Sequence, residues 1–550
     1  MRAIHLDRRQ FLSKTAKSAA AYALAKATLA QSSELIAPHS GSELTAKLAA
    51  DPRRPQVHLL PAANWMNDPN GPIYWKGRYH MFFQYNPNAA VWGDMHWAHA
   101  ISPDMIHWKH LPVALAPTPG GPDADGCFSG TAVVRNGVPT FIYTGVVHTP
   151  EDQATIRDGK NSYRETQLYA TSTDPELRTW TKRATPVIAS PPQGLQVTGF
   201  RDPAPWRELG LEPGLDKDTW LMAVGSGIQG KGGAVLLYKS TDLQNWEYLH
   251  FVASGLATGG NAANPVDSGD MWECPDLFPL GNKHVLIYST QGKVFWKTGE
   301  LDPKELLFHE QQSGVLDYGS FYAPKTQLDK SGNRILWGWI PETRPVAEYS
   351  AAGWAGLMSL PRVLTVGADG RLKIAVSPAI ERLRKHEQKL RLAPSKLGDP
   401  GSKELLSDQR LKDACGELLC LIKPGPEPFT FDLLDTTKRS SAPKDATTAV
   451  ASQVSLISLR YSHANPNELV VDQQRLPIHL DNGESLELRF FVDGSVIELF
   501  VNGQATSTKR FYYPGSTAPE IAVSMTGDPK DVTRLSLWQL SPISKDRLTT

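Results

Sequence analysis

Three carboxyl side chains stand next to or near a proline in short polar stretches, and their spacing along the chain is regular. The stretches read Asn-Asp-Pro at Asp68, Arg-Asp-Pro at Asp202 and Glu-Cys-Pro at Glu273. Asp68 and Asp202 are 134 residues apart (202 − 68), and Asp202 and Glu273 are 71 apart (273 − 202), close to two periods and one. Acids that recur at one period take equivalent places on repeated structural units. We therefore expect the three carboxyl groups to converge on one site.

A pair of convergent carboxyl groups is the arrangement that cleaves a glycosidic bond with retention of configuration. One carboxylate attacks the anomeric carbon, and the other protonates the leaving oxygen and then deprotonates the incoming water. Asp68 lies between two asparagines and turn amides, which can hold it ionised as a nucleophile. Glu273 lies between Trp272 and Cys274. This apolar setting, together with the charge of Asp68, predicts a raised pKa and the role of the acid.

Asp202 has a different neighbour, because Arg201 directly precedes it. The sequence predicts an ion pair between them and a carboxylate that stays charged, suited to holding sugar hydroxyls and stabilising positive charge on the ring. Each acid taken alone is equally explained as an ordinary turn or cap carboxylate. The stretch 64–71, Asn-Trp-Met-Asn-Asp-Pro-Asn-Gly, is itself typical of a turn. The large apolar residues on both sides of the turn favour a pocket floor.

A second motif repeats within residues 56–380 and predicts how the acids are positioned. Short apolar strands alternate with turn residues there, without long helical periodicity, so this region is predicted to be all-β. A Ser-x-Asp sequence followed by tryptophan occurs at 102–108, 172–180 and 240–246, with serines 70 (172 − 102) and 68 (240 − 172) residues apart. This period predicts a β-propeller catalytic domain of roughly five blades. Three similar hairpins in a β-sandwich are the alternative.

The composition changes after about residue 380. Residues 381–405 are charged and predict a hinge or linker. Over 406–550, short strands resume at even spacing, and a hairpin signal ends at Asn502-Gly503, which predicts a β-sandwich domain. No catalytic motif is visible in this domain. We expect it to stabilise the protein, with glycan binding as the alternative.

The overall composition narrows the function classes. Lys+Arg and Asp+Glu number 57 each, so the formal net charge of +0 predicts no nucleic-acid or anionic-membrane partner. The 15 Trp and 16 Tyr suit sugar rings as well as β-sheet cores. The four cysteines include no Cys-x-x-Cys pair and no zinc-type cluster, so we expect neither a metal nor another cofactor. Cys415 and Cys420 are an odd number of residues apart, on opposite faces of a strand, and all four cysteines are predicted to be free thiols.

The amino-terminal region has features of an export signal. Arg8 and Arg9 followed by Phe-Leu resemble a twin-arginine signal, and small residues in the Ala-rich run that follows suit cleavage. The run is too short for a membrane span and contains Lys26. We expect a signal peptide over 1–30, a linker over 31–55 and a periplasmic or extracellular protein without a membrane anchor. A basic amphipathic surface helix is the alternative.

Several longer blocks resemble the sequence motifs of glycoside hydrolase family 32, the family of invertases, fructan exohydrolases, inulinases and levanases. The resemblance extends over roughly residues 56 to 550. The matching blocks are residues 65–71, 83–87, 92–93, 97–100, 127–130, 201–203, 273–275, 318–323, 353–356 and 361–362. Gly338-Trp339 with Glu342 resembles the plant-type members in particular. Two departures are small: Ala98 stands where many members carry glycine, and Lys325 follows the block at 318–323.

The resemblance implies a fold and a role for each matching residue. It implies a five-bladed β-propeller followed by a β-sandwich. Asp68 would be the nucleophile on C2 of a β-linked fructosyl unit, Glu273 the general acid/base and Asp202 the transition-state stabiliser. The residues implied to line the fructose subsite are Asn67, Gln84, Trp92, Phe128, Ser129 and Arg201.

We therefore expect a retaining hydrolase that releases fructose from sucrose or a fructan. A fructosyltransferase would use the same site, with a sugar replacing water in the second half-reaction. A non-catalytic fructan-binding protein, in which the acids serve recognition alone, is an alternative of a different class. The motifs do not distinguish among sucrose, inulin and levan, because that choice depends on loops such as 148–166 and 256–271.

Overall fold

A computed structural model shows the fold of the 550-residue chain. The structure describes residues 43–158, 161–207, 219–255, 269–394, 404–437, 454–544 and 546–548. The expected signal peptide at 1–30 and most of the expected linker lie outside these ranges. No helix in the described ranges has the length and hydropathy that a membrane span needs.

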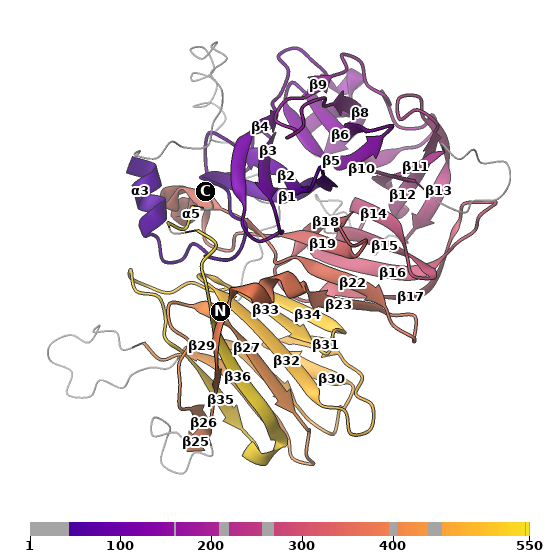
Figure 1. Ribbon diagram of the computed structural model, residues 1–550. Coiled ribbons are helices and arrows are strands. Elements are labelled where there is room, and N and C mark those ends of the chain that lie inside the picture. Colours follow the sequence, from indigo (N-terminus) through magenta and orange to yellow (C-terminus); the bar gives the residue numbers. More distant parts are fainter. Residues whose placement is uncertain are drawn as a thin grey trace.

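The amino-terminal domain consists of five sheets arranged in a ring (Figure 1). The innermost strand of each sheet contacts those of the neighbouring sheets, and the contact of the first with the fifth closes the ring. These inner strands are β1 (Asn64–Trp75), β5 (Gly126–Arg135), β10 (Val197–Arg207), β14 (Glu273–Leu280) and β18 (Tyr322–Leu328). The domain is therefore a five-bladed β-propeller, as predicted, and the alternative of three hairpins in a sandwich is wrong.

The remaining strands of each blade follow outward from the inner strand. Blades one and two contain β2 (Arg78–Asn86), β3 (His96–Ser102) and β4 (Lys109–Leu115), then β6 (Val138–His148), β7 (Ile156–Asp158), β8 (Asn161–Thr171) and β9 (Thr181–Lys182). Blades three and four contain β11 (Trp220–Ile228), β12 (Gly232–Ser240) and β13 (Glu247–Ser254), then β15 (Lys283–Thr290), β16 (Lys293–Leu301) and β17 (Phe308–Asp317). Blade five contains β19 (Arg334–Ile340), β21 (Leu357–Met358), β22 (Arg362–Val366) and β23 (Leu372–Val376), and the short β20 (Trp354–Ala355) pairs with β1.

The repeated Ser-x-Asp motif is the turn from the third strand of a blade to its outer strand. In blades one to three the aspartate N–H donates to the serine hydroxyl at the same distance of 3.1 Å, at Asp104, Asp174 and Asp242. Blade four builds a related turn on Asp302, whose carboxylate accepts the N–H groups of Lys304 and Glu305. This fourth copy has neither the serine nor the tryptophan. A pattern defined by serine and tryptophan therefore does not include this turn.

Each inner strand is interrupted by a β-bulge. The register shifts fall between Met66 and Pro69, Phe128 and Gly130, Arg201 and Ala204, Glu273 and Asp276, and Tyr322 and Lys325. Four of these bulges contain a proline, which cannot donate to the strand ladder, and a bulge redirects the neighbouring side chains. The stretch 64–71 is therefore part of strand β1, and its interpretation as a turn is wrong. Its Asp-Pro-Asn-Gly residues form bulges instead.

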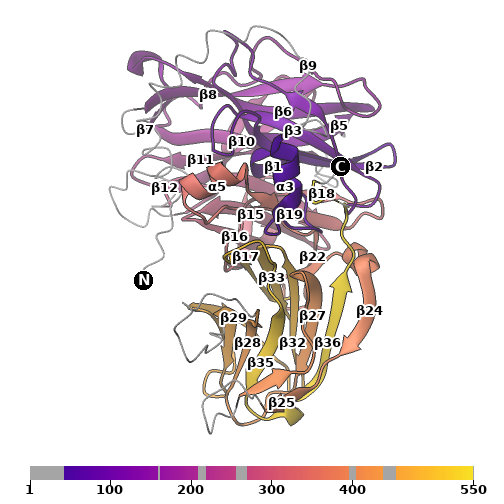
Figure 2. The same cartoon turned by 90° about the vertical axis from the view of Figure 1, so that its left-hand side faces the viewer.

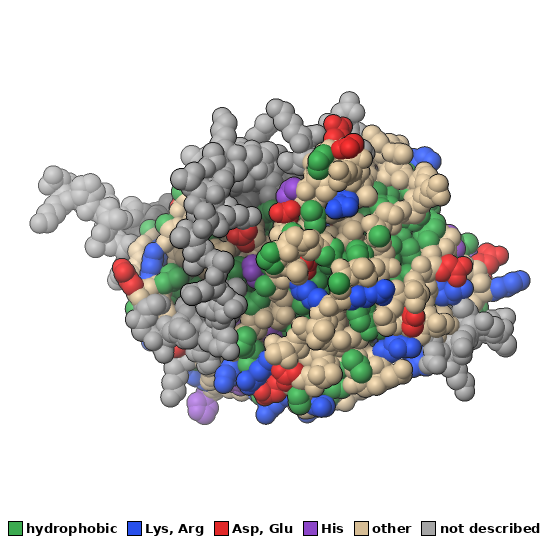
Figure 3. Space-filling model, turned by 90° about the horizontal axis from the view of Figure 1, so that it is seen from above, with side chains coloured by type: hydrophobic (Ala, Val, Ile, Leu, Met, Phe, Trp, Pro, Cys, Tyr) green, Lys and Arg blue, Asp and Glu red, His purple; other side chains and the backbone are tan. Residues whose placement is uncertain are grey.

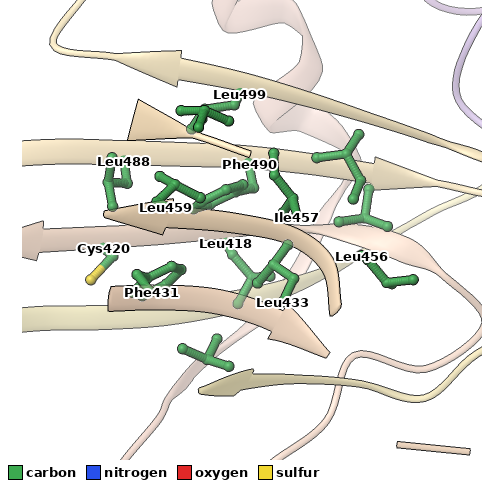
Figure 4. Packing of buried hydrophobic residues seen from close by; sticks show 14 of the residues in the cluster. Leu418, Cys420, Phe431, Leu433, Leu456, Ile457, Leu459, Leu488, Phe490 and Leu499 are labelled. Atoms are coloured by element: carbon green, nitrogen blue, oxygen red, sulfur yellow. The ribbon is translucent and has the colours of Figure 1, made fainter. Parts of the chain in front are cut away.

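The carboxy-terminal domain is the predicted β-sandwich. One sheet contains β24 (Arg384–Lys389), β36 (Val532–Leu540), β27 (Cys415–Ile422), β32 (Leu486–Asp493), β33 (Val496–Val501) and β34 (Ala505–Arg510). The other contains β25 (Leu392–Pro394), β26 (Leu405–Ser407), β35 (Ile521–Thr526), β28 (Phe429–Asp435), β29 (Val454–Tyr461), β30 (Glu468–Val471) and β31 (Gln474–Pro477). Apolar side chains of both sheets meet in the core, where Phe431 and Phe490 stack at 5.5 Å between ring centroids (Figure 4). All four cysteines are buried free thiols, as predicted.

Buried ionic groups join the two domains where the propeller stands on the sandwich (Figure 2). Arg362 of β22 contacts Asp317 at the end of β17 and Glu498 of β33, at 2.8 and 2.6 Å. His58 lies between Asp493 and Glu498, at 2.8 and 2.9 Å. Burial would lower the pKa of His58, but hydrogen bonds to these two carboxylates and their charges raise it to about 9. The contact is therefore built from charges that compensate one another.

Two segments expected to be linkers contain regular structure. Within 31–55, helix α3 (Glu43–Ala50) buries Leu48 against a cluster that includes Trp354 beside helix α5 (Val346–Ala352) and Leu548 near the carboxyl terminus. The carboxy-terminal segment runs back from the sandwich to this part of the propeller (Figure 1). Within 381–405, β24 and β25 are strands of the sandwich sheets. The composition of these segments predicted linkers. The structure differs because their ordered contacts are made with residues that are distant in the sequence.

Candidate active site

The three acids lie on the inner strands of blades one, three and four. Asp68 and Asp202 meet at the thiol of Cys274, and the charge of Glu273 acts on Asp202. The Sγ of Cys274 is 3.6 Å from Asp68 Oδ2 and 3.4 Å from Asp202 Oδ2. Glu273 directly precedes this cysteine. The exposed fractions of the residues Asp68, Asp202 and Glu273 are 0%, 2% and 2%. The structure thus brings together the carboxyl groups that the spacing predicted to converge.

The three acids do not occupy the same position on their strands. Asp68, Asp202 and Cys274 each directly precede the proline of a bulge, whereas Glu273 comes one residue earlier, where blade three carries Arg201. The expectation of fully equivalent positions is therefore wrong by one residue for Glu273. Asp202 and Cys274 have φ angles of 63° and 49°. Residues other than glycine rarely adopt this left-handed backbone conformation. These bulges direct the carboxyl groups into the common site.

Asp68 is held by a network of polar side chains from blades one and two. Asn67 Nδ2 donates to its Oδ1 at 2.9 Å, and Ser129 Oγ donates to its Oδ2 at 2.5 Å. Gln84 joins the two donors, because its Oε1 accepts from Asn67 and its Nε2 donates to Ser129, both at 2.7 Å. All four residues are almost fully buried. The two donors stabilise the negative charge of Asp68 and fix the direction in which its oxygens point.

Glu273 is bonded by an arginine and a tyrosine. Arg201 donates to its Oε1 through Nη2 at 2.6 Å and through Nε at 3.1 Å, and Tyr322 O–H donates to its Oε2 at 3.0 Å. The predicted ion pair between Arg201 and Asp202 is wrong: the ion pairs of Arg201 are with Glu273 and Glu165. Both residues lie at the bulge of β10, where Asp202 has a positive φ, so their adjacency in the chain does not by itself make them ion-pair partners. The surroundings of Glu273 are accordingly less apolar than the sequence indicates.

Asp202 lies in a setting that disfavours its charge. Burial raises its pKa to about 6, and the charges of Glu273 and Asp68 add to the effect. The charge of Arg201 and the hydrogen bond from the N–H of Cys274, 2.9 Å from Oδ2, act in the opposite direction. Several close carboxylates cannot all ionise easily, because like charges repel in a buried site. The expectation that Asp202 is held firmly ionised is therefore not met below about pH 6.

Trp92 and Phe128 form an aromatic pair beside this polar cluster. Their rings pack edge to face with centroids 5.8 Å apart, and both residues are half-buried. Phe128 directly precedes Ser129, so the aromatic pair adjoins the hydroxyl that bonds Asp68. No group of three or more His, Cys, Asp or Glu suited to a metal occurs in the described parts of the chain. The acids are therefore surrounded by amide, hydroxyl, guanidinium and aromatic groups, which are suited to a sugar ring.

Both domains of the chain match models of known protein families. The family model described as the N-terminal domain of glycosyl hydrolases family 32 matches residues 58–378, which is more than half of the chain. The chain belongs to glycosyl hydrolase family 32. The model for the C-terminal domain of the family matches residues 437–539. Membership in family 32 makes the protein a glycoside hydrolase that acts on O-glycosyl bonds, as predicted.

Curated relatives and solved structures of family 32 match the chain over most of its length. It is 34% identical to a sucrose-6-phosphate hydrolase of Escherichia coli over 88% of this chain and 94% of that protein. It is 35% identical to a raffinose invertase of Escherichia coli over 88% and 95%. Fructan 1-exohydrolase IIa from Cichorium intybus, solved in complex with 1-kestose, is 26% identical with a TM-score of 0.68, covering 89% of this chain and 98% of that one. The two-domain architecture of this family 32 protein is thus shared with known members.

Three residues of the family 32 site were not singled out from the sequence. Cys274 and Tyr322 lie within blocks that resemble family motifs, but nothing in their type indicated contact with the acids. Glu165 lies in β8, in an ordinary strand sequence without a motif. Its bond to Arg201 joins residues that are 36 positions apart in the chain. The contact between Glu165 and Arg201 could not be predicted from the sequence, because it forms only when blades two and three pack side by side.

Proposed function

We propose that this family 32 enzyme releases fructose from sucrose or from a β-linked fructan, with retention of configuration. The observation that carries the proposal is a buried group of acids at the inner strands of the propeller: Asp68 and Asp202 meet at the thiol of Cys274, and Glu273 is close enough for its charge to act on Asp202. The names of its relatives, which include an invertase and a fructan exohydrolase, support fructosyl substrates. Inulin and levan are further candidates for the same site.

In the proposed first half-reaction, Asp68 attacks C2 of the fructosyl unit. The bond from C2 to the leaving oxygen breaks, and Glu273 transfers its proton to that oxygen. A covalent fructosyl ester on Asp68 results. The carboxylate of Asp202 stabilises the positive charge that develops on the ring, and Arg201 holds the acid in place through its two bonds to Oε1.

In the proposed second half-reaction, Glu273 removes a proton from a water molecule that attacks C2 and frees Asp68. Two inversions at C2 produce net retention. The side chains that we propose to surround the fructosyl ring come from blades one to three: Asn67, Gln84, Trp92, Phe128, Ser129 and Arg201. If a sugar hydroxyl replaces the water, the same steps produce a longer fructan, so product analysis separates hydrolysis from transfer.

A substrate panel tests this proposal. Wild type, Asp68→Ala and Glu273→Ala are incubated with sucrose, 1-kestose, inulin and levan, and released fructose is measured. Asp242→Ala is the matched control, because its carboxylate lies in the outer turn of blade three. We expect fructose from at least one substrate with wild type and the control, and a loss of at least about a thousandfold with either site variant. Binding of fructan without release of fructose would support the non-catalytic alternative instead.

The anomeric outcome tests the chemistry independently. Proton NMR of the first product formed is expected to show β-fructofuranose before mutarotation, as a retaining enzyme produces. An initial α-anomer would contradict a covalent intermediate on Asp68.

We also propose that the protein is exported through its amino-terminal twin-arginine sequence. The motif at Arg8 and Arg9 and the Ala-rich run that follows support this proposal. An extracellular or periplasmic location would place the enzyme where it meets polymeric substrates.

A further inference from the structure

We infer that Glu165 is a positioning residue for the general acid: it shares the guanidinium of Arg201, so that Glu273 can carry the proton that it transfers. This inference rests on the proposed function, in which Glu273 is the acid. It assigns a mechanistic role to a residue of blade two that bonds Arg201 and Phe200 and none of the three acids.

Glu165 reaches from β8 of blade two to β10 of blade three. Its residue is 0% exposed. Its Oε1 accepts from Arg201 Nη1 at 3.0 Å, and its Oε2 accepts from the N–H of Phe200 at 2.5 Å. Arg201 uses its other donors, Nη2 and Nε, for Glu273. The guanidinium therefore lies between two carboxylates, one from each neighbouring blade.

The shared guanidinium bears on whether the general acid can hold its proton beside a buried arginine. A buried arginine bonded twice to a general acid favours the ionised form of that acid, which has no proton to donate. Burial alone would lower the pKa of Arg201, but the charges of Glu165 and Glu273 raise it well above its ordinary value, so the guanidinium stays charged. With Glu165 present, Arg201 is already neutralised by one carboxylate. Glu273 then faces a nearly neutral pair instead of an isolated positive charge.

Charged and titratable groups from all five blades face this pair, and none of the others can replace Glu165. They are Asp68 on β1, Tyr163 and Glu165 on β8, Arg201 and Asp202 on β10, Glu273 and Cys274 on β14, and Tyr322 and Lys325 on β18. Lys325 bonds the carbonyl of Pro275 at 2.8 Å. Among these groups, only the two glutamates form ion pairs with Arg201.

The test compares pH profiles of kcat/KM for wild type, Glu165→Gln and Glu165→Asp on the substrate that wild type hydrolyses. The Gln variant removes the charge but keeps an acceptor, and the Asp variant keeps the charge. Glu417→Gln is the matched control, because Glu417 is a buried glutamate shared by Arg384 and Arg489 in the sandwich. Glu165→Ala is a second neutral variant in case the Gln variant does not fold, and thermal unfolding shows which variants are folded.

We expect Glu165→Gln to move the alkaline limb of the profile to lower pH by about one unit, because Arg201 then acts on Glu273 alone. On that limb the rate falls about tenfold for each unit of displacement. The loss should be smaller on an aryl β-fructofuranoside, whose leaving group needs little protonation. Glu165→Asp and Glu417→Gln should keep the limb of wild type.

A purely structural role for Glu165 would produce a different result. Both neutral variants would then lose activity to the same extent at every pH and on both substrates, with the alkaline limb unmoved, and that outcome overturns this inference alone. If wild type releases no fructose from any substrate, the proposed function fails first and this inference fails with it.

Discussion

At the scale of single residues, the neighbours of each carboxyl group differentiate three otherwise similar acids. Asp68 accepts bonds from uncharged donors, Asn67 and Ser129. Glu273 is bonded by a charged donor and a phenol, and Asp202 has its pKa raised to about 6 by burial first and by neighbouring acids second. Asymmetry of this kind is what allows one carboxylate to attack while another holds a proton.

The assignment of Glu273 as the acid predicts how its loss depends on the substrate. Glu273→Ala should lose most activity on sucrose, where the leaving oxygen must be protonated. On a fructoside with a nitrophenol leaving group, the activity of the variant relative to wild type should be higher than on sucrose, on the order of tenfold or more. Rates on the two substrates under identical conditions measure this. An equal loss on both would contradict the assignment.

The twin-arginine proposal also concerns single residues. Replacing both Arg8 and Arg9 with lysine keeps the charge of the segment, so only recognition of the arginine pair is changed. The protein should then accumulate in the cytoplasm, which is measured by fractionating cells and assaying fructose release in each fraction. A single Lys26→Ala substitution, in the Ala-rich run, is the control. Unchanged export of the double variant would refute the signal.

At the scale of elements, the bulges of the inner strands determine where the acids point. A regular strand would send adjacent side chains to opposite faces. The register shifts in β1, β10 and β14 instead bring the carboxyl groups of Asp68 and Asp202 to the thiol of Cys274 on β14. At the bulge of β1, the loss of ladder hydrogen bonds is offset by the network that joins Asn67, Gln84 and Ser129 to Asp68.

Two glycines of the first hairpin test this dependence on β1. Gly71 and Gly77 both have positive φ, 49° and 82°. A Cβ on Gly71 would lie 2.7 Å from the backbone nitrogen of Ala132 on β5, whereas a Cβ on Gly77 would meet nothing within 4 Å. Gly77→Ala should cost about 1–2 kcal/mol from backbone strain and leave kcat/KM unchanged.

Gly71→Ala should cost more stability than Gly77→Ala and should also lower kcat/KM. The added methyl group displaces β1 from β5, and Asp68 and Ser129 lie on these two strands. Thermal unfolding and steady-state kinetics of both variants measure the two effects. Equal kinetics for the two variants would show that the spacing of the inner strands does not control the site.

At the scale of the whole molecule, the propeller and the sandwich share buried charges. Arg362 and His58 lie among Asp317, Asp493 and Glu498, and all of these side chains are 0% exposed. The face in Figure 3 has a different character, because acidic and basic side chains are scattered there among polar and apolar ones. This fits the formal net charge of +0.

The His58 contact predicts a loss of stability at alkaline pH. The pKa of His58 is raised from 6.5 to about 9 in the folded protein, so its contribution is fully present below about pH 6.5 and is lost as the pH rises through 9. The shift corresponds to about 3 kcal/mol. The midpoint of thermal unfolding should therefore fall between pH 7 and pH 9.5, and it should fall less in His58→Gln. Parallel curves for the two proteins would contradict this prediction.

The sequence alone determined the parts of this protein that depend on local chemistry and on repetition. The period of the Ser-x-Asp turns predicted the propeller, the strands after residue 406 predicted the sandwich, and the spacing of Asp68, Asp202 and Glu273 predicted that they meet. The polar neighbours of Asp68 were also visible, since Asn67 is adjacent in the chain. Such features can be predicted from the sequence because each one either repeats along the chain or involves residues that are close together in it.

Only the tertiary structure decided which charged groups face one another. Arg201 is adjacent to Asp202 in the chain but pairs with Glu165 and Glu273, which come from other blades. Stretch 64–71 has the composition of a turn but is held as a bulged strand by its neighbour β2. The physical reason is the same in both cases: bulges rotate side chains, and blades packed side by side supply partners that sequence distance conceals.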